Sequence, residues 1–362
     1  MLDWCIILRM DKIRNTYTVN VGDIKIGSTN PVVVQSMCSA PAEDFNKNLE
    51  QIKQLQEAGC ELVRVSVPSQ TALKCFEKLC KISSVPLIAD IHFRPDLAIR
   101  TIEAGASKIR INPGNLGGLD KTDEIIKVAS SHKVPIRIGV NAGSLEDDLK
   151  AREDMSLAEK LAESAKRYVD YFNEHNFRDI VVSLKAHDVN TCVEANREFA
   201  KLMPQVPLHL GITEAGTKDQ GIIKSAAGLG ILLSEGIGDT IRISLTDNPV
   251  EEVKACYSLL SALDLRRVHP EIISCPTCGR TKVDLIKIAN EVESKISNIK
   301  APIKVAVMGC VVNGPGEAEG ADIGVACELG GGSIFKQGKV IRKVKENEIV
   351  PALLEEISKI VD

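Results

Sequence analysis

Short apolar runs alternate with segments of helical spacing between residues 30 and 250 of this chain. The runs are residues 32–37, 62–67, 86–91, 108–111, 135–140, 179–184, 207–212 and 240–245. Between them, segments such as 46–58 and 157–173 repeat apolar residues at the intervals of an amphipathic helix. Short β-branched runs are typical of strands buried in a parallel sheet. Eight such units predict an α/β protein with a (β/α)8 barrel of the TIM type, in preference to a doubly wound open sheet.

Polar residues recur near the carboxyl ends of six of these runs, where an apolar barrel strand would need none. The pairs are Arg64/Ser66, Asp90/His92, Arg110/Asn112, Arg137/Asn141, Ser183/Lys185 and Arg242/Ser244. Residues two or four apart on a strand point to the same face. Active sites of TIM barrels lie at the carboxyl ends of the strands, so we expect these side chains to meet at the barrel mouth. Glu214 joins them from the loop after the seventh strand.

The charges at this predicted mouth are unbalanced. Four arginines and one lysine face two carboxylates, Asp90 and Glu214. Buried cations are costly unless an anion pairs with them, and arginine suits phosphate oxygens. The excess therefore predicts a ligand with two phosphates; an internal lattice of salt bridges is the alternative.

The periodicity changes after Leu265, which predicts a second, smaller α/β domain. We expect helices at 283–296 and 348–360, strands at 303–308, 322–325 and 339–343, and a Gly-Gly-Gly turn before the last strand. The predicted domains are therefore 1–265, which would bind the phosphates, and 266–362.

Three cysteines and a glutamate of this second domain have the spacing of a metal site. Cys275 and Cys278 form a Cys-x-x-Cys pair, and Cys310 begins a Gly- and Pro-rich loop that ends at Glu317. Thiolates favour iron–sulfur clusters or zinc, and a carboxylate is a harder and more exchangeable ligand. A structural zinc half-site or a redox dithiol are the alternatives.

Composition narrows the function classes. The net charge of −4 and the aromatic content of 3% argue against a general nucleic-acid binder. No apolar run is long enough to span a bilayer, so we expect no membrane association. Eleven cysteines without a signal peptide indicate a reducing cytoplasm, where thiols stay free or bind metal.

Taken together, these motifs resemble the 4-hydroxy-3-methylbut-2-enyl diphosphate synthase family of non-mevalonate isoprenoid biosynthesis, in its short bacterial form. The resemblance runs from about Met10 to the end of the chain. Its motifs are Pro31-Val-Val-Val-Gln-Ser-Met37, Ile109-Arg-Ile-Asn-Pro-Gly-Asn115, Gly211-Ile-Thr-Glu-Ala-Gly216, Cys275-Pro-Thr-Cys278-Gly-Arg and Gly309-Cys310-Val-Val-Asn-Gly-Pro-Gly-Glu317. One departure is Cys38-Ser39-Ala40-Pro41, where the family usually has Thr-Asn-Thr.

The resemblance implies a TIM barrel followed by a reductase-like domain that carries one [4Fe-4S] cluster per chain. Cys275, Cys278, Cys310 and Glu317 would be its ligands. The implied reaction is the two-electron reductive ring opening and dehydroxylation of 2-C-methyl-D-erythritol 2,4-cyclodiphosphate, an iron–sulfur oxidoreductase activity. The product is (E)-4-hydroxy-3-methylbut-2-enyl diphosphate, and reduced flavodoxin or ferredoxin would be the electron donor.

The resemblance also implies roles for single residues and an assembly. Glu214 would supply or position a proton, and Glu317 would leave the cluster for substrate. The implied substrate contacts are Arg64, Asp90, His92, Arg110, Asn112, Asn115, Arg137, Asn141, Lys185, Arg242 and Ser244. Family members are similar in being head-to-tail homodimers. A non-redox barrel, such as a pterin- or sugar-phosphate-binding transferase, with a zinc-stabilised interaction module remains the competing hypothesis.

Overall fold

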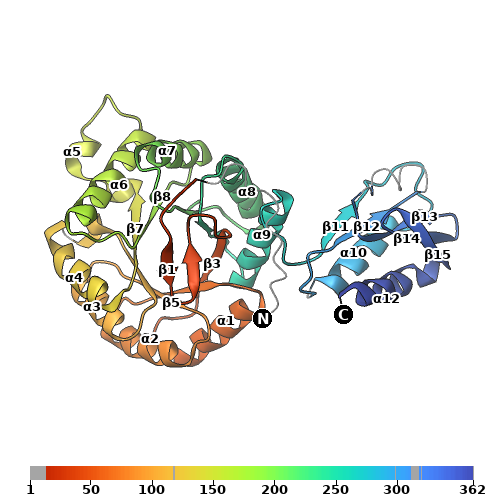
Figure 1. Cartoon of the computed structure of the whole chain (residues 1–362), viewed down its shortest axis with the longest axis horizontal. Helices are drawn as coiled ribbons and strands as arrows, with labels where there is room; N and C mark the ends of the chain where they lie inside the picture. Colours follow the sequence, from red (N-terminus) through yellow and green to blue (C-terminus); the bar gives the residue numbers. More distant parts are fainter. Residues whose placement is uncertain (1–13, 117–118, 298, 311–317, 319, 362) are drawn as a thin grey trace. The chain divides into compact units, whose positions relative to one another are not determined.

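The computed structural model describes residues 14–116, 119–297, 299–310, 318 and 320–361. The chain divides into two compact units, of which one ends at Leu265 and the other continues from Arg266 (Figure 1). None of the described helices is both long and apolar enough to span a membrane.

The first unit is a barrel of eight parallel strands. These are β3 (Val33–Met37), β4 (Leu62–Ser66), β5 (Leu87–Asp90), β6 (Lys108–Ile111), β7 (Ile136–Asn141), β8 (Ile180–Lys185), β9 (His209–Leu210) and β10 (Thr240–Ile241). They neighbour one another in the order β8-β7-β6-β5-β4-β3-β10-β9. A parallel bridge between Val182 and Leu208 closes the ring. The predicted (β/α)8 barrel is confirmed.

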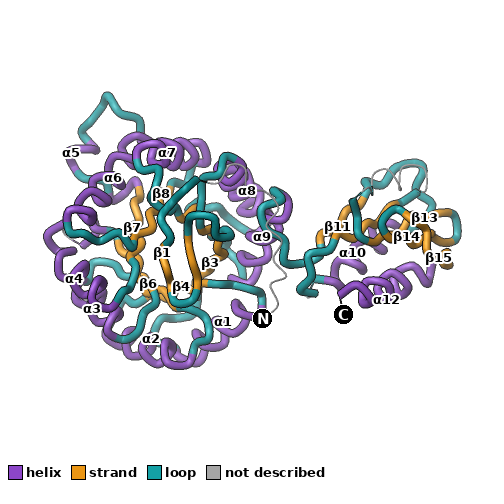
Figure 2. Tube along the Cα trace, viewed as in Figure 1, coloured by secondary structure: helices purple, strands orange, loops and turns teal. Residues whose placement is uncertain are grey.

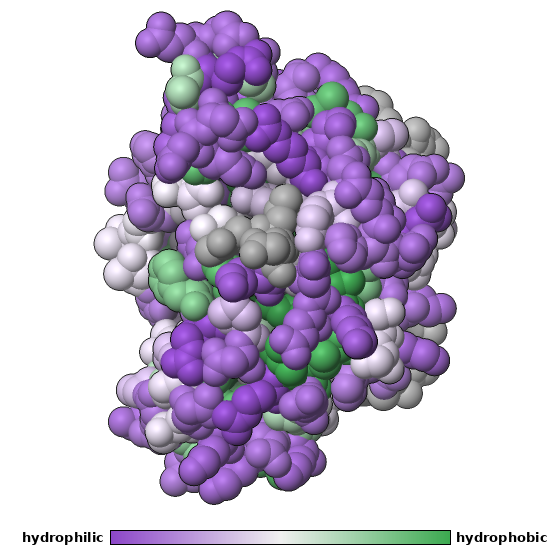
Figure 3. All heavy atoms as spheres, turned by 90° about the vertical axis from the view of Figure 1, so that its left-hand side faces the viewer, coloured by the Kyte–Doolittle hydropathy of each residue, from purple (hydrophilic) through white to green (hydrophobic). Residues whose placement is uncertain are grey.

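Helices follow the strands and form an outer ring around them (Figure 2). They are α1 (Phe45–Glu57), α2 (Gln70–Ile82), α3 (Pro95–Glu103), α4 (Asp123–His132), α5 (Asp147–Lys150), α6 (Leu157–Glu174), α7 (Val189–Leu202), α8 (Lys218–Ser234) and α9 (Pro249–Ala262). Side-chain caps define several starts: Ser156 and Glu159 form a capping box at α6. Outward-facing positions are polar, and the face in Figure 3 is accordingly mostly hydrophilic with small apolar areas.

A two-stranded hairpin precedes the barrel and was not predicted. It consists of β1 (Val19–Val21) and β2 (Ile24–Ile26). Its buried residues pack against the first or second residues of four barrel strands; this cluster comprises Val19, Val21, Ile26, Val33, Leu62, Ile88 and Val181. The hairpin therefore covers the amino-terminal end of the barrel, opposite the end where the polar strand residues lie.

Over its described residues, the second unit is a five-stranded mixed sheet with two α-helices. Its strands are β11 (Glu271–Ser274), β12 (Lys304–Met308), β13 (Ile323–Glu328), β14 (Gly331–Lys336) and β15 (Lys339–Lys345), and they neighbour one another in that order. The pairs β11–β12 and β12–β13 are parallel, and the other two are antiparallel. Helices α10 (Leu285–Ile296) and α12 (Ile349–Val361) share one apolar core with one face of the sheet. The other face carries a smaller cluster around Met308 and Phe335.

Strand β14 replaces most of the predicted Gly-Gly-Gly turn. Only Gly330 has a turn conformation, with φ of +76°, while Gly331 and Gly332 pair with β13 and β15. A Cβ at Gly331 would lie 2.2 Å from the carbonyl oxygen of Val344, so close strand packing requires glycine there. The run of glycines indicated a turn because the sequence does not reveal such an approach.

Candidate functional site

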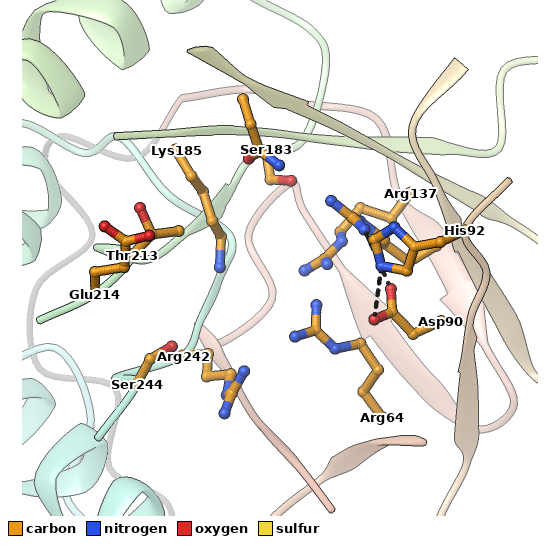
Figure 4. A pocket seen from close by; sticks show the side chains of 12 residues that line it. Arg64, Asp90, His92, Arg137, Ser183, Lys185, Thr213, Glu214, Arg242 and Ser244 are labelled. Atoms are coloured by element: carbon orange, nitrogen blue, oxygen red, sulfur yellow. Dashed lines mark hydrogen bonds and ion pairs between the residues drawn. The ribbon is translucent and has the colours of Figure 1, made fainter. Parts of the chain in front are cut away.

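The polar strand ends surround one cavity of about 330 Å³ at the carboxyl end of the barrel (Figure 4). Its lining is Arg64, Asp90, His92, Arg110, Arg137, Asn141, Ser183, Lys185, Thr213, Glu214, Arg242 and Ser244. The lining contains every predicted substrate contact of the barrel except Asn112 and Asn115, together with Glu214. These side chains come from strands far apart in the sequence, which the closed barrel brings to one end.

Asn112 and Asn115 lie beside the cavity lining rather than in it. The Asn112 side chain is buried, donates to Ser144 Oγ at 2.6 Å and accepts from the Gly114 N–H at 3.1 Å. Asn115 belongs to the 3₁₀ turn Pro113–Leu116 that follows. These contacts give Asn112 a role in shaping the loop after β6.

Asp90, His92 and Arg110 form a hydrogen-bonded group on one side of the cavity. Arg110 Nη1 lies 3.4 Å from Asp90 Oδ1 and 2.9 Å from His92 Nε2, and His92 Nε2 lies 3.4 Å from Asp90 Oδ2. Burial opposes ionisation of Asp90, but Arg64, His92 and Arg110 hold its pKa well below the usual range. Asp90 is therefore an anion that orients two groups of the lining.

Arg137 and Lys185 are the least compensated cations of the cavity. Arg137 is 1% exposed, and its Nε and Nη1 atoms have no hydrogen-bond partner among the described residues. Burial, and then Arg64 and Arg110, lower the pKa of Arg137 well below its ordinary value. Burial, and then Arg137 and Arg64, do the same for Lys185. A bound anion would relieve both penalties.

Arg64 rests against a thioether. Its Nε and Nη2 atoms lie 3.0 Å and 2.8 Å from Met37 Sδ. Burial lowers the pKa of Arg64 to about 10, with Asp90 opposing and Arg242 and Arg110 adding to the shift. Because a thioether is a weak acceptor, Arg64 can exchange it for a phosphate oxygen at little cost.

Arg242 has a carboxylate partner that the sequence reasoning missed. Glu252 on α9 accepts from Arg242 Nε at 2.9 Å and Nη2 at 2.8 Å, and Ser36 Oγ donates to it at 2.7 Å. The cavity lining contains the two predicted carboxylates, Asp90 and Glu214, and Glu252 adds a third negative charge behind Arg242. Glu252 and its neighbour Glu251 both lie in the first turn of α9. Nothing in the local sequence shows which of the two acids points inward.

Two glycines make room for the cations. A Cβ at Gly139 would lie 2.7 Å from Arg110 Nε, and one at Gly211 would lie 2.8 Å from Lys185 Nζ. Both glycines are on or beside barrel strands whose other inward residues are large. The absence of side chains there leaves the space that the ends of Arg110 and Lys185 occupy.

Glu214 stands at the rim in an unusual backbone conformation. Its φ is +54°, a left-handed value that a non-glycine residue adopts at a cost. Its side chain is exposed and lines the cavity on the side of Lys185 (Figure 4). A strained residue with an accessible carboxyl group is suited to proton transfer with a bound ligand.

A second polar layer lies inside the barrel and was also missed. Lys108, Gln35 and His209 are fully buried, and Lys108 Nζ, His209 Nε2 and both terminal atoms of Gln35 have no hydrogen-bond partner among the described residues. Burial, and then Arg137 and Arg64, lower the pKa of Lys108 well below its ordinary value. The sequence did contain a signal for Lys108: it precedes Arg110 by two residues on the same strand, so the two side chains point to the same face.

The divergent loop after β3 is held by one side chain of α1. Gln51 Oε1 accepts from the backbone N–H groups of Ser39 and Ala40 at 2.9 Å and 3.1 Å. Cys38 is buried, and burial raises the pKa of its thiol to about 12. Cys38 is therefore a packed side chain and no reactive thiolate.

The predicted metal ligands follow neighbouring strands of the second unit. Cys275 follows β11 and Cys310 follows β12, and the Gly309 N–H donates to Cys275 Sγ at 3.2 Å. Cys278 is exposed, and hydrogen bonds from Arg280 lower its pKa. Over the described residues no three His, Cys, Asp or Glu side chains are gathered around one point, and Glu317 lies outside the described residues.

Cys327 does not belong to this set of accessible thiols. It lies on β13, is fully buried in the core beneath the helices, and burial raises its pKa to about 12. Its burial makes Cys327 no candidate for a metal ligand beside Cys275, Cys278 and Cys310.

Two family models match the chain. The GcpE TIM-barrel domain matches residues 16–257, and the GcpE protein C-terminal domain matches residues 271–359. Among solved structures, dihydropteroate synthases from Stenotrophomonas maltophilia (TM-score 0.51, 16% identity, 68% of this chain and 97% of that one) and Vibrio fischeri (0.50, 11%, 69% and 99%) are similar. At such identities the likeness concerns the barrel fold alone.

Curated relatives are similar to this chain over nearly their whole length. Three of them, from Aquifex aeolicus, Clostridium tetani and Bacillus subtilis, are named 4-hydroxy-3-methylbut-2-en-1-yl diphosphate synthase (flavodoxin). That of Aquifex aeolicus is 52% identical over 95% of this chain and 96% of its own. Those of Clostridium tetani (49%, over 97% and 100%) and Bacillus subtilis (50%, over 94% and 90%) are comparable. The chain therefore belongs to the GcpE family of 4-hydroxy-3-methylbut-2-en-1-yl diphosphate synthases, as its sequence motifs predicted.

Proposed function

We propose that this protein reduces 2-C-methyl-D-erythritol 2,4-cyclodiphosphate to (E)-4-hydroxy-3-methylbut-2-enyl diphosphate. The observation that carries the proposal is the unbalanced charge of the barrel cavity. Five cations, Arg64, Arg110, Arg137, Lys185 and Arg242, line it. Asp90, Glu214 and the Arg242 partner Glu252 are the carboxylates beside them, so two positive charges (five minus three) remain for a ligand. A cyclic diphosphate with one ionised oxygen on each phosphorus matches this excess.

The proposed reaction balances with two electrons. The C2–O bond to the ring phosphate and the C3–O bond to the hydroxyl group break, and a C2=C3 double bond forms. Counted on the fully protonated species, two electrons and two protons enter and one water leaves. The diphosphate stays on C4, so its contacts with the cavity persist through the reaction.

The arginines and the lysine would hold the two phosphates during this change. Arg137 and Lys185 gain most from the ligand because their charges are the least compensated in the free protein. Asp90 keeps Arg110 and His92 oriented toward the ligand, and Asn141 and Ser244 add neutral hydrogen-bonding groups to the lining. Glu214 would donate the proton that the departing C3 hydroxyl needs.

The electrons require a metal centre, for which the second unit has a suitable donor set. Cys275 and Cys310 leave adjacent parallel strands at the same edge, and the lowered pKa of Cys278 favours its thiolate. Thiolates on such loops fit a [4Fe-4S] cluster, and we assign Cys275, Cys278 and Cys310 as three ligands and Glu317 as the fourth. The cluster would supply the two electrons singly, after receiving them from reduced flavodoxin or ferredoxin.

We further propose a head-to-tail homodimer in which each cluster serves the barrel of the partner chain. The support is that each unit carries only part of the chemistry. Mixing a Cys310→Ser chain with an Arg137→Met chain tests this arrangement, because mixed dimers would contain one intact pair of units. Recovery of activity on mixing supports the dimer; two inactive variants that stay inactive in verified mixed dimers contradict it.

Anaerobic purification with metal analysis and a turnover assay tests the function. We expect broad visible absorbance, about four irons per chain, and conversion of the cyclodiphosphate. Cys310→Ser should abolish the absorbance, whereas Glu214→Gln should abolish turnover and leave the absorbance intact. A colourless protein with one zinc after anaerobic reconstitution would instead support a non-redox barrel with a zinc module.

A further inference from the structure

The outermost strand of the second unit is basic and carries exposed apolar side chains. Residues 336–345 contain five Lys or Arg residues and no Asp or Glu, although the whole chain has a net charge of −4. Val340 is 60% exposed on β15, and Leu329, at the tip of the β13–β14 turn, is 84% exposed. We name Leu329, Val340, Lys343 and Lys345 the basic edge patch.

The register of the sheet places one end of this patch level with the cysteine loops. Met308 pairs with Ala326, Ala326 with Ser333, and Ser333 with Lys343. One step further, Glu328 pairs with Gly331 and Gly331 with Lys345. Strands β12, β13 and β15 run in the same direction, so Cys310, two residues after Met308, leaves the sheet at the level of Lys345.

The distances across the sheet are short. Neighbouring strands lie about 4.8 Å apart, so β15 is roughly 14 Å from β12, and the Leu329 turn begins on the strand next to β12. A protein that docks on the basic edge patch would therefore lie close to the cysteine loops.

The lysines of the patch lie on the face of the sheet that is not covered by α10 and α12. Ser333 alternates with Ile334, whose side chain belongs to the core beneath α10 and α12, so Ser333 and its partner Lys343 point to the opposite face. That opposite face holds the small apolar cluster around Met308; Cys275, at the end of β11, packs against this cluster and also against the core beneath the helices. Arg342 points the other way and pairs with Glu355 of α12 at 3.0 Å.

The two lysines are available to a partner. Lys343 lies 3.9 Å from Glu328, but its side chain is 75% exposed, and such a solvated pair contributes little. Lys345 is exposed as well. Exposed apolar residues beside solvated charges are the composition of a transient docking site, where the charges set the association rate.

We propose that the basic edge patch is the docking site of an acidic electron-donor protein. The proposal rests on the proposed function, and the relatives named for flavodoxin indicate the class of donor. In each encounter the reduced donor would lose one electron to the cluster, so that two encounters supply one turnover. Asp and Glu side chains on the donor would pair with Lys343 and Lys345, and Leu329 and Val340 would contact its apolar residues.

The double variant Lys343→Glu/Lys345→Glu tests the proposal, with Lys287→Glu/Lys295→Glu on α10 as the matched control. The control makes the same charge change on the helix-covered side of the sheet. Turnover is measured with reduced flavodoxin over a range of salt concentrations and, separately, with a small-molecule reductant. We expect the flavodoxin-driven rate of the patch variant to fall about tenfold at low salt and to lose its salt dependence.

The small reductant separates docking from catalysis. We expect it to drive the patch variant as fast as the unchanged protein, and the control variant to keep both activities. An unchanged flavodoxin-driven rate overturns the proposal. An equal loss with both reductants also overturns it, because edge lysines would then act through folding, through association with a second copy of the chain or against sheet aggregation. If the unchanged protein turns over with neither reductant, the proposed function itself fails.

Discussion

Arg242 and Glu252 form a two-point ion pair on the wall of the barrel cavity, with Nε–Oε2 at 2.9 Å and Nη2–Oε1 at 2.8 Å. The carboxylate also accepts from Ser36 Oγ at 2.7 Å and from the Leu245 N–H at 3.1 Å. The pair fixes the plane of the guanidinium group and leaves Nη1 outside it, where the weak acceptor Met37 Sδ lies at 3.7 Å. Glu252 is therefore a positioning residue for a phosphate-binding arginine.

Replacing Glu252 by Gln should raise the KM for substrate by about tenfold or more and lower kcat less. The amide can accept at only one atom, so Arg242 loses its fixed orientation and its compensating charge. We expect a loss of stability of about 2–4 kcal/mol, measured by denaturant unfolding. Glu251→Gln, the same change one residue earlier on α9, is the control. Equal effects of the two substitutions, or a fall in kcat alone, would contradict the positioning role.

Binding of a diphosphate should draw protons from solution at pH values between the lowered pKa of Lys185 in the free protein and its higher pKa in the complex. In the free protein the pKa of Lys185 lies well below its ordinary value, and a bound anion would restore it. Calorimetric titration with pyrophosphate, in buffers that differ in ionisation enthalpy, measures the uptake. Lys185→Met should reduce it. A heat of binding that is independent of the buffer would be the contrary result.

Gly139→Ala should weaken substrate binding and leave the fold intact. The new Cβ would lie 2.7 Å from Arg110 Nε, and the flexible end of an arginine can move away, which displaces its phosphate contact. We expect KM to rise about tenfold, as for one lost charge-assisted hydrogen bond, with little change in Tm. A Cβ at Gly143 meets no atom within 4 Å, so Gly143→Ala is the control. A large loss of Tm with normal KM would refute this explanation.

Lys108→Met should stabilise the protein by about 1–3 kcal/mol, because it removes a buried ionisable group that has no hydrogen-bond partner among the described residues. The folded state binds fewer protons than the unfolded state between the depressed pKa of Lys108 and about 10.4. Stability should therefore rise with pH across that window in the unchanged protein. Denaturant unfolding at several pH values should show a flatter dependence in the variant. A destabilised variant would mean that Lys108 has an anionic partner in the working protein.

The two-residue spacing of polar residues on the strands, together with the count of eight strand–helix units, predicted much of the site. Arg64, Asp90, Arg137 and Lys185 face one cavity because strands place alternate residues on one side. Glu252 could not be found in the same way, since it reaches the cavity wall from a helix that looks like any surface helix. Its inward direction depends on the packing of α9 against β3, which no local pattern encodes.

The smaller elements were missed for a different physical reason. Strands β1 and β2 have three residues each, and an isolated pair of that size is not stable. Their alternation is visible in the sequence, but only the barrel beneath them makes them a structural element. Similarly, β14 contains glycines because the neighbouring strand approaches too closely for a side chain. The prediction assigned these glycines to a turn, because turns are where glycine most often occurs.

The hairpin formed by β1 and β2 closes the amino-terminal end of the barrel, so the barrel is open at its carboxyl end. Because Val19, Val21 and Ile26 cover the amino-terminal end, a charged ligand bound among the arginines must leave through the same opening by which it entered. Any structure that covers this opening during the reaction would therefore control both substrate binding and product release.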